Sequence, residues 1–203
     1  MENKDFVFII DNGHGSVING VPQTAGKRSP DFGDGVLYEG LSNRRLADKV
    51  IKQCEPLGIC CYNLVPELED ISLGERVKRV NRIARKNKSI LISLHSDAWI
   101  NEHAHGWSAY TTKGGTKSDD VATILYKYAK EAGVHIRDDY SDGDPDKEAD
   151  FYILRKTICP AVLVESLFMT NKKDYKTLMS ESGQDLLVKI IVESIKDIYC
   201  NGI

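Results

Sequence analysis

Runs of apolar residues that stop abruptly at polar, chemically active side chains are the main pattern in this chain. Three mostly apolar runs share this form, and each leads to a side chain able to bind a metal or a proton: residues 6–10 before His14, residues 89–94 before His95 and residues 161–164 before Glu165. Runs without alternation are typical of strands buried on both faces of a parallel sheet. Because open α/β sheets bind ligands at the carboxyl ends of their strands, we expect these three side chains to lie close together.

Helical periodicity fills the segments between these runs. Apolar spacing predicts helices from Glu39 to about Gly58, from a Ser72/Glu75 capping box to residue 84, and over residues 118–132 and 184–199. Shorter strands are predicted at 59–65, 107–112 and 152–155, and a short helix begins at residues 170–171, where Asn171 is the N-cap. Such alternation predicts an α/β fold, a three-layer α/β/α sandwich around a mostly parallel, mixed central sheet. Since neither a repeat nor a linker interrupts it, residues 1–203 are predicted to form a single domain.

Two long loops stand out. Residues 16–38 are rich in glycine, proline and serine, and long loops inside a compact domain are usually functional. Residues 137–150 are crowded with aspartates but lack the carboxylate order and the central glycine of an EF-hand, so we predict a solvated loop there. The arginines and lysines of residues 76–86 are interpreted as the solvated face of a helix.

Composition excludes several classes of function. The chain has 203 residues, 41% hydrophobic and 28% charged, which is ordinary for a globular protein. A net charge of −3 gives no long-range attraction to nucleic acid or to an anionic membrane. We find neither a membrane-spanning run nor a signal peptide, and expect no nucleic-acid partner, no membrane insertion and a monomer made in the cytoplasm. Five cysteines without a CxxC pair argue against a disulfide framework and are interpreted as small buried hydrophobic residues.

The candidate chemistry is that of a hydrolytic metal site. Two histidines and one carboxylate make a tripod that zinc accepts with a fourth position open to water. His14, His95 and Glu39 are the candidate ligands, and Glu165 is the candidate acid/base group. The spacing of these residues does not by itself decide whether they bind a metal. Potential ligands so far apart in sequence also occur by chance, and a histidine after a strand is often only a turn residue.

Four motifs in order resemble the zinc-dependent N-acetylmuramoyl-L-alanine amidases, which cleave peptidoglycan. The similar stretches are residues 11–15, 39–43, 93–97 and 154–171, so the resemblance covers nearly the whole chain. It implies zinc bound by His14, Glu39 and His95, with Glu165 as the catalytic carboxylate. Asn43 and Arg155 are candidate substrate-binding residues, although an ion pair with an aspartate explains Arg155 equally well. The chain departs from the family pattern in the longer loop after His14, in Ser96-Asp97 and in Ser166-Leu167; His103, His105 and His135 match no motif.

The resemblance implies hydrolysis of the amide bond between N-acetylmuramic acid and L-alanine of the stem peptide, with peptidoglycan as the partner. Without an export signal, the chain is similar to a phage or prophage endolysin that reaches the bacterial cell wall after release; a trimmed mature form is the alternative. Two other functions remain open. One is a glycoside hydrolase that uses Glu39 and Glu165 as its carboxylate pair, which leaves both histidines unexplained. The other is a non-catalytic wall-binding module.

Overall fold

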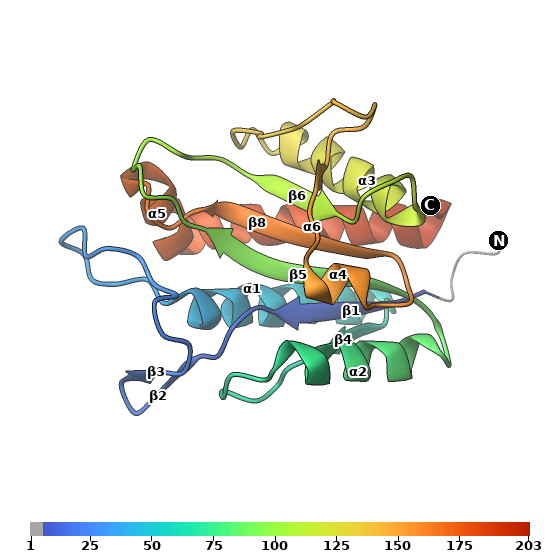
Figure 1. Ribbon diagram of the computed structural model, residues 1–203, viewed down its shortest axis with the longest axis horizontal. Helices are drawn as coiled ribbons and strands as arrows, with labels where there is room; N and C mark the ends of the chain where they lie inside the picture. Colours follow the sequence, from blue (N-terminus) through green and yellow to red (C-terminus); the bar gives the residue numbers. More distant parts are fainter. Residues whose placement is uncertain (1–5) are drawn as a thin grey trace.

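A six-stranded sheet forms the centre of the computed structural model, which describes residues 6–203 (Figure 1). The strands lie in the order β4-β1-β5-β8-β6-β7. Their bounds are Phe6–Asn12 for β1, Cys61–Asn63 for β4, Lys88–Asp97 for β5, Ser108–Thr111 for β6, Lys147–Glu148 for β7 and Ala161–Phe168 for β8. Only the β6–β8 pair is antiparallel within this sheet, so the predicted mostly parallel, mixed sheet is confirmed.

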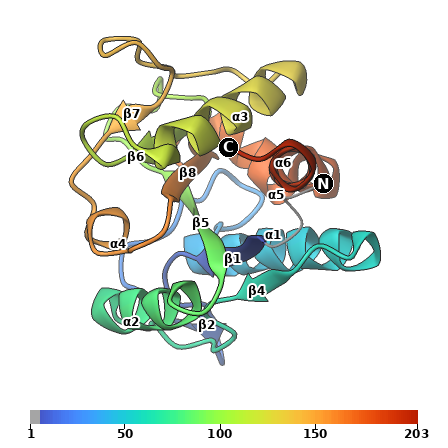
Figure 2. The same ribbon diagram turned by 90° about the vertical axis from the view of Figure 1, so that its right-hand side faces the viewer.

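Helices cover both faces of the sheet (Figure 2). On one face lie α1 (Glu39–Cys54), α3 (Lys117–Glu131), α5 (Lys172–Met179) and α6 (Glu181–Asn201), and on the other lie α2 (Leu73–Ala84) and α4 (Tyr152–Arg155). The three-layer α/β/α prediction is therefore confirmed. No helix between Phe6 and Ile203 is long and apolar enough to cross a membrane.

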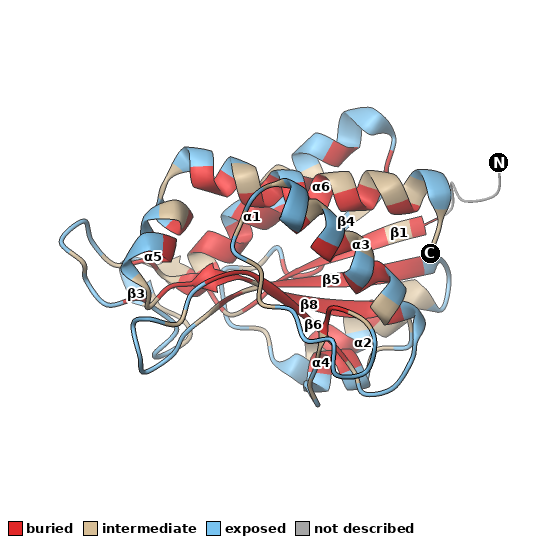
Figure 3. Cartoon of the chain, turned by 90° about the horizontal axis from the view of Figure 1, so that it is seen from above, coloured by how far each residue is buried: buried red, intermediate tan, exposed pale blue. Residues whose placement is uncertain are grey.

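Alternate residues of the central strands enter two separate cores. Phe8, Ile10, Ile92 and Val164 pack with α1, α3 and α6, whereas strand neighbours such as Leu91 pack with α2 and α4. The strands are consequently buried on both faces while the helices keep exposed outer surfaces (Figure 3). This parity explains why the strand sequences read as continuous apolar runs rather than as alternating ones.

The alternation of side chains along each strand also decides on which face of the sheet the candidate site residues lie. His95 lies four residues after Leu91 on β5, so its side chain projects from the α2/α4 face of the sheet. Glu165 pairs directly with His95 in the β5–β8 register and projects from the same face. The β2–β3 hairpin (Val17–Ile18 and Val21–Pro22) belongs to the loop between β1 and α1.

One predicted strand is wrong: residues 152–155 form the helix α4. Its first turn closes on Phe151, whose carbonyl accepts from Leu154 N at 3.1 Å and from Arg155 N at 3.0 Å. Asn81 of α2 holds the following residues, because its side chain donates to Lys156 O and accepts from Ile158 N. Tertiary packing against α2 therefore outweighs the strand propensity of a short tyrosine–isoleucine segment.

Helix ends follow local capping chemistry. Asn171 caps α5 as predicted, since its Oδ1 accepts from Lys173 N and Asp174 N. Ser72 caps α2 by accepting from Glu75 N, but the Glu75 carboxylate pairs with Arg79 rather than completing a capping box. The helix predicted to reach Gly58 ends at Cys54, and a 3-10 turn covers the rest.

The arginines of α2 contradict the prediction of a wholly solvated face. Arg76 is 2% exposed, and Arg79 pairs with Glu67 at 2.8 Å. The cysteine interpretation is wrong for Cys60 and Cys200, which are exposed, whereas Cys54 is buried and Cys61 and Cys159 pack partly buried against the cores. Sequence periodicity indicates which residues share one face of a helix, but it does not indicate which residues of other elements contact that face.

The aspartate-rich loop, residues 137–150, is only partly solvated. Its residues Lys147 and Glu148 form β7 at the edge of the sheet, and Asp146 is 2% exposed. The Thr111 hydroxyl donates to one carboxylate oxygen of Asp146 at 2.5 Å. Burial, followed by the contact with the Asp144 carboxylate, raises the pKa of Asp146 to about 7.

This raised pKa predicts a pH-dependent gain of stability for Asp146→Asn. The pKa of Asp146 lies above its ordinary value of 3.8, so its stabilising contribution is complete below that value and is lost as pH rises through about 7. Asp146→Asn should therefore raise Tm relative to wild type more at pH 8 than at pH 5. Asp142→Asn, at an exposed position in the same loop, is the control; an equal Tm difference at both pH values for Asp146→Asn would contradict the prediction.

Candidate metal centre and active site

Three residues far apart in sequence meet at the carboxyl end of the sheet. His14 follows β1, His95 lies near the end of β5, and Glu39 is the first residue of α1. One possible ligand atom of each lies within 4.8 Å of the others, so the group could hold a metal ion. The structure therefore brings together the three ligands predicted from the sequence.

The separations of Glu39 from the two histidines match those in a tetrahedral metal site. Glu39 Oε1 lies 3.3 Å from His14 Nε2 and 3.2 Å from His95 Nδ1. Ligands about 2.0–2.1 Å from a tetrahedral zinc-type centre are separated by about 3.3 Å. His14 Nε2 and Glu39 Oε2 are buried and make no hydrogen bond to any described residue. The missing hydrogen bonds and this donor set fit a bound metal ion.

Glu39 is held in its ionised form. The carboxylate is 1% exposed, and this burial alone would raise its pKa, but the close contacts with the His14 and His95 imidazoles outweigh it and hold the pKa well below the usual range. Ser96 N donates to Glu39 Oε1 at 3.2 Å, and Lys27 Nζ lies 3.9 Å from Oε2. An anionic carboxylate between two imidazoles is suited to bind a metal ion rather than to donate a proton.

Gly13 lets the two histidines approach each other. A Cβ at this position would lie 2.2 Å from His95 Cε1, so any side chain would displace that ring. Gly13 N donates to Leu94 O at 3.0 Å, and the Asn43 side chain donates to Gly13 O at 3.2 Å. The turn is thus tied to both β5 and α1.

Two buried arginines hold the backbone of His14. This residue has a φ of 66°, in the left-handed region that residues other than glycine seldom adopt. Its carbonyl accepts from Arg44 Nη1 at 2.7 Å and from Arg76 Nη2 at 3.3 Å. Arg76 also pairs with Asp11 at 2.5 Å, where both side chains are almost fully buried. The arginines thereby hold the backbone of His14 in this conformation.

Glu165 lies beside the three-residue group but outside it. It pairs with His95 across β5 and β8, and its Oε2 is buried without a hydrogen bond to the described residues. Burial raises the pKa of Glu165 well above its usual value, and the negative charges of Glu39 and Asp97 raise it further. Such a carboxyl group readily takes up and releases a proton.

The two predicted substrate contacts have other partners in this structure. Asn43 is fully buried and bonds to Gly13 O, which favours a positioning role. Arg155 pairs with Asp150 at 2.6 Å at the end of α4, as the ion-pair alternative expected. Roles for Asp11, Arg44 and Arg76 were not predicted from the sequence, where the available signal was a charged residue within an otherwise apolar strand, next to the first histidine motif.

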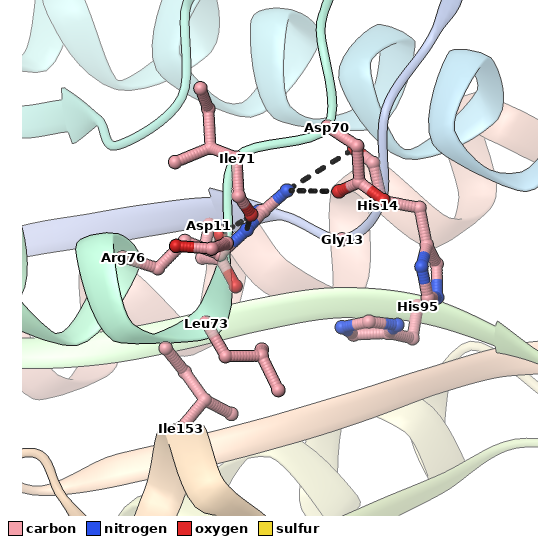
Figure 4. Close-up of a pocket in the computed structure, with 10 residues that line it drawn as sticks. Asp11, Gly13, His14, Asp70, Ile71, Leu73, Arg76, His95 and Ile153 are labelled. Carbon is pink, nitrogen blue, oxygen red and sulfur yellow. Dashed lines mark hydrogen bonds and ion pairs between the residues drawn. The ribbon is translucent and has the colours of Figure 1, made fainter. Parts of the chain in front are cut away.

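A cavity of about 440 Å³ opens beside the two histidines (Figure 4). Its lining combines the aliphatic side chains of Ile71, Leu73 and Ile153 with the charged side chains of Asp70 and Arg76. In the close-up, the imidazoles of His14 and His95 approach each other at its edge. A substrate lying in this cavity can therefore reach the candidate metal site.

Comparison with known proteins gives a consistent assignment. A family model described as N-acetylmuramoyl-L-alanine amidase matches residues 8–197. An uncharacterized cell wall amidase of Bacillus anthracis is 29% identical over 203 aligned residues, which cover 94% of this chain and 35% of that protein. The endolysin of Bacillus phage SPP1 is 24% identical over 173 residues, covering 81% of this chain and 60% of that protein.

The solved N-acetylmuramoyl-L-alanine amidase of Clostridium difficile 630 has the same fold. It superposes with a TM-score of 0.80 at 24% identity, covering 98% of each chain. The present chain spans 35% to 60% of the length of the curated relatives it matches.

The buried ion pair predicts a large loss of stability for Arg76→Met. The substitution keeps an unbranched side chain but leaves Asp11 buried without its cation, and breaking such a pair costs about 3–5 kcal/mol. Urea denaturation should show a lower free energy of unfolding by that amount. Arg82→Met, on the exposed part of the same helix, is the matched control. Equal losses for the two variants would contradict the importance of the buried pair.

Proposed function

The chain belongs to the N-acetylmuramoyl-L-alanine amidase family, and from that premise we propose that it hydrolyses the amide bond between N-acetylmuramic acid and L-alanine of the stem peptide. The observation that carries the proposal is the group of His14, Glu39 and His95, in which two buried ligand atoms make no hydrogen bond to any residue from 6 to 203. Glu165 beside it supplies the acid/base group that amide hydrolysis needs.

Zinc is the ion that we propose for this site. Two imidazoles and one carboxylate form the His₂Glu ligand set used by catalytic zinc, which leaves a position open to substrate or water. When bound, zinc supplies a Lewis acid that polarises a carbonyl and lowers the pKa of water toward about 7. The chain contributes the three ligands and, through Arg44 and Arg76, the orientation of His14.

Glu165 is the proposed proton carrier. It accepts a proton from the attacking water while a C–O bond forms at the acyl carbon. It then donates that proton to the alanine nitrogen as the C–N bond breaks, because an amine is too basic to leave unprotonated. The raised pKa of Glu165 suits a group that must hold a proton between these two steps.

The two other candidate functions fit the geometry less well. A glycoside hydrolase needs one protonated and one ionised carboxyl group around the sugar. Here Glu39 already engages two histidines, which such a mechanism does not use. A non-catalytic module has no need for Glu165 beside the metal group. We also propose that the protein acts on the bacterial cell wall. Its release as an endolysin and its monomeric state stay predictions.

The bond that is cut tests the proposal directly. Incubation with purified peptidoglycan should release stem peptides with a new L-alanine amino terminus and leave the glycan strands intact. Amino-terminal analysis and an assay for reducing sugars measure the two products separately. New reducing ends without new amino termini would transfer the function to a glycoside hydrolase.

Zinc content distinguishes the proposed ligands from the proposed acid/base residue. His14→Ala and His95→Ala should lose both zinc and activity, because each removes one of three ligands. Glu165→Gln should keep its zinc and lose about 10²–10⁴ in rate, since the amide retains the shape but cannot carry the proton.

Elemental analysis of protein purified without added metal, run beside the rate assay, checks both statements. Thermal unfolding of each variant controls for misfolding. If Glu165→Gln contained no zinc, Glu165 would be a ligand and the proposed roles of the two glutamates would be wrong. If metal-free wild-type protein were fully active, the zinc mechanism would be wrong.

A further inference from the structure

A second cavity, of about 280 Å³, lies beyond the end of β5. Its lining includes Asp97, Trp99, Tyr110, Arg137 and Phe168. None of these residues belongs to the proposed metal group or to the cavity beside the two histidines. The cavity therefore needs an explanation of its own.

Strand register places this cavity next to Glu165. Ser108 of β6 pairs with Glu165, and Tyr110 lies two residues further along the same face of β6. On the other side, His95 pairs with Glu165, and Asp97, after a shift in register, pairs with Phe168 of the cavity lining. This cavity therefore lies at the strands that flank Glu165, β5 and β6, whereas residues around β1 and α2 line much of the first cavity.

The walls of the cavity combine aromatic surface with a charged pair. Trp99 is 62% exposed, and its backbone is held because Trp99 N donates to Thr170 Oγ1 at 3.0 Å. The Arg137 guanidinium lies 4.5 Å from the centre of the Phe168 ring and 3.5 Å from Asp97 Oδ2. The cavity thus offers a large, accessible aromatic face beside a planar donor and a carboxylate acceptor.

This set of groups matches a sugar ring better than a peptide. A pyranose has apolar C–H faces that pack on aromatic rings and equatorial hydroxyl and amide groups that both donate and accept hydrogen bonds. Arg137 donates and Asp97 accepts, so both polarities are present at the aromatic surface. By contrast, the cavity beside the histidines is lined by the aliphatic Ile71, Leu73 and Ile153, which suit aliphatic peptide side chains.

We propose that the cavity formed by Asp97, Trp99, Tyr110 and Arg137 binds an N-acetylated hexosamine ring of a glycan strand. The inference rests on the proposed function for the identity of the glycan and deepens it by orienting the substrate. The sugar lies on the β6 side of Glu165, and the peptide lies on the side of His14 and α4. Trp99 contributes the stacking surface, and Arg137 and Asp97 contribute the hydrogen bonds.

Binding can be measured without catalysis, because the two tryptophans of the chain differ in accessibility. Trp107 is 1% exposed, so acrylamide should quench mainly the fluorescence of Trp99. The probe is the N-acetylglucosamine trisaccharide, titrated into zinc-loaded wild-type protein. We expect saturable protection of Trp99 from quenching, and about tenfold weaker binding in Arg137→Gln and Tyr110→Ala.

Ile100→Ala is the matched control, because this neighbour of Trp99 is 99% exposed and does not line the cavity. It should bind the trisaccharide as wild type does. Failure of the trisaccharide to protect Trp99 would overturn the proposal. So would protection by a sugar-free stem peptide in its place, which would assign the cavity to the peptide.

Kinetics give an independent readout that also separates this proposal from the proposed function. On a soluble disaccharide–peptide, Trp99→Ala should raise KM about tenfold and change kcat by less than twofold. An equal loss of kcat, or an unchanged KM, would overturn the sugar site even if the amidase activity is established. Trisaccharide binding without any amidase activity would instead support the cavity and remove the proposed reaction.

Discussion

The buried contact of Arg76 with Asp11 and with the backbone after β1 is the interaction on which the site depends. His14 adopts a left-handed conformation, which is uncommon for a residue with a side chain and persists only when the surroundings hold it. Arg44 from α1 and Arg76 from α2 reach its carbonyl from helices on opposite faces of the sheet. Asp11 keeps one of these buried cations neutralised, and Ser93 donates to the same carboxylate at 2.6 Å. Catalytic geometry and fold stability therefore share one polar network.

The alternation of side chains along the strands brings the candidate site residues of the sheet to one face. His95 and Glu165 project from the same face of the sheet as the strand residues that pack on α2 and α4. The residues next to them in each strand project from the other face and pack under α1, α3 and α6. The larger core therefore stabilises the sheet without contributing a residue from the strands to the site. Glu39 enters from the first turn of α1, on the other face, so both layers must be in place before the three ligands can meet. Assembly of the metal group thereby reports on the folding of the whole sandwich.

Sequence patterns predicted the elements whose signal is local and left out the contacts that depend on tertiary neighbours. Continuous apolar runs located β1, β5 and β8, and with them the positions of His14, His95 and Glu165. The same reasoning placed Arg76 on a solvated face, because helical periodicity does not reveal an aspartate in a strand 65 residues earlier. Tyr152–Arg155 was predicted as a strand, although contacts with Asn81 of α2 stabilise a helix there. A burial pattern can be read from a chain, whereas the partner of a buried charge is known only when distant segments have met.

The two glutamates show how one residue type can take two roles in the same site. Glu39 and Glu165 are both shielded from solvent, and burial alone would raise the pKa of each. At Glu39 the two imidazoles reverse that effect, so the carboxylate stays ionised, as a metal ligand must. At Glu165 the negative charge of Glu39 acts in the same direction as burial and favours the protonated form. The histidines thus stabilise one anion, and that anion raises the proton affinity of the other carboxylate. In the proposed mechanism this separation of pKa values assigns the ligand and the proton carrier.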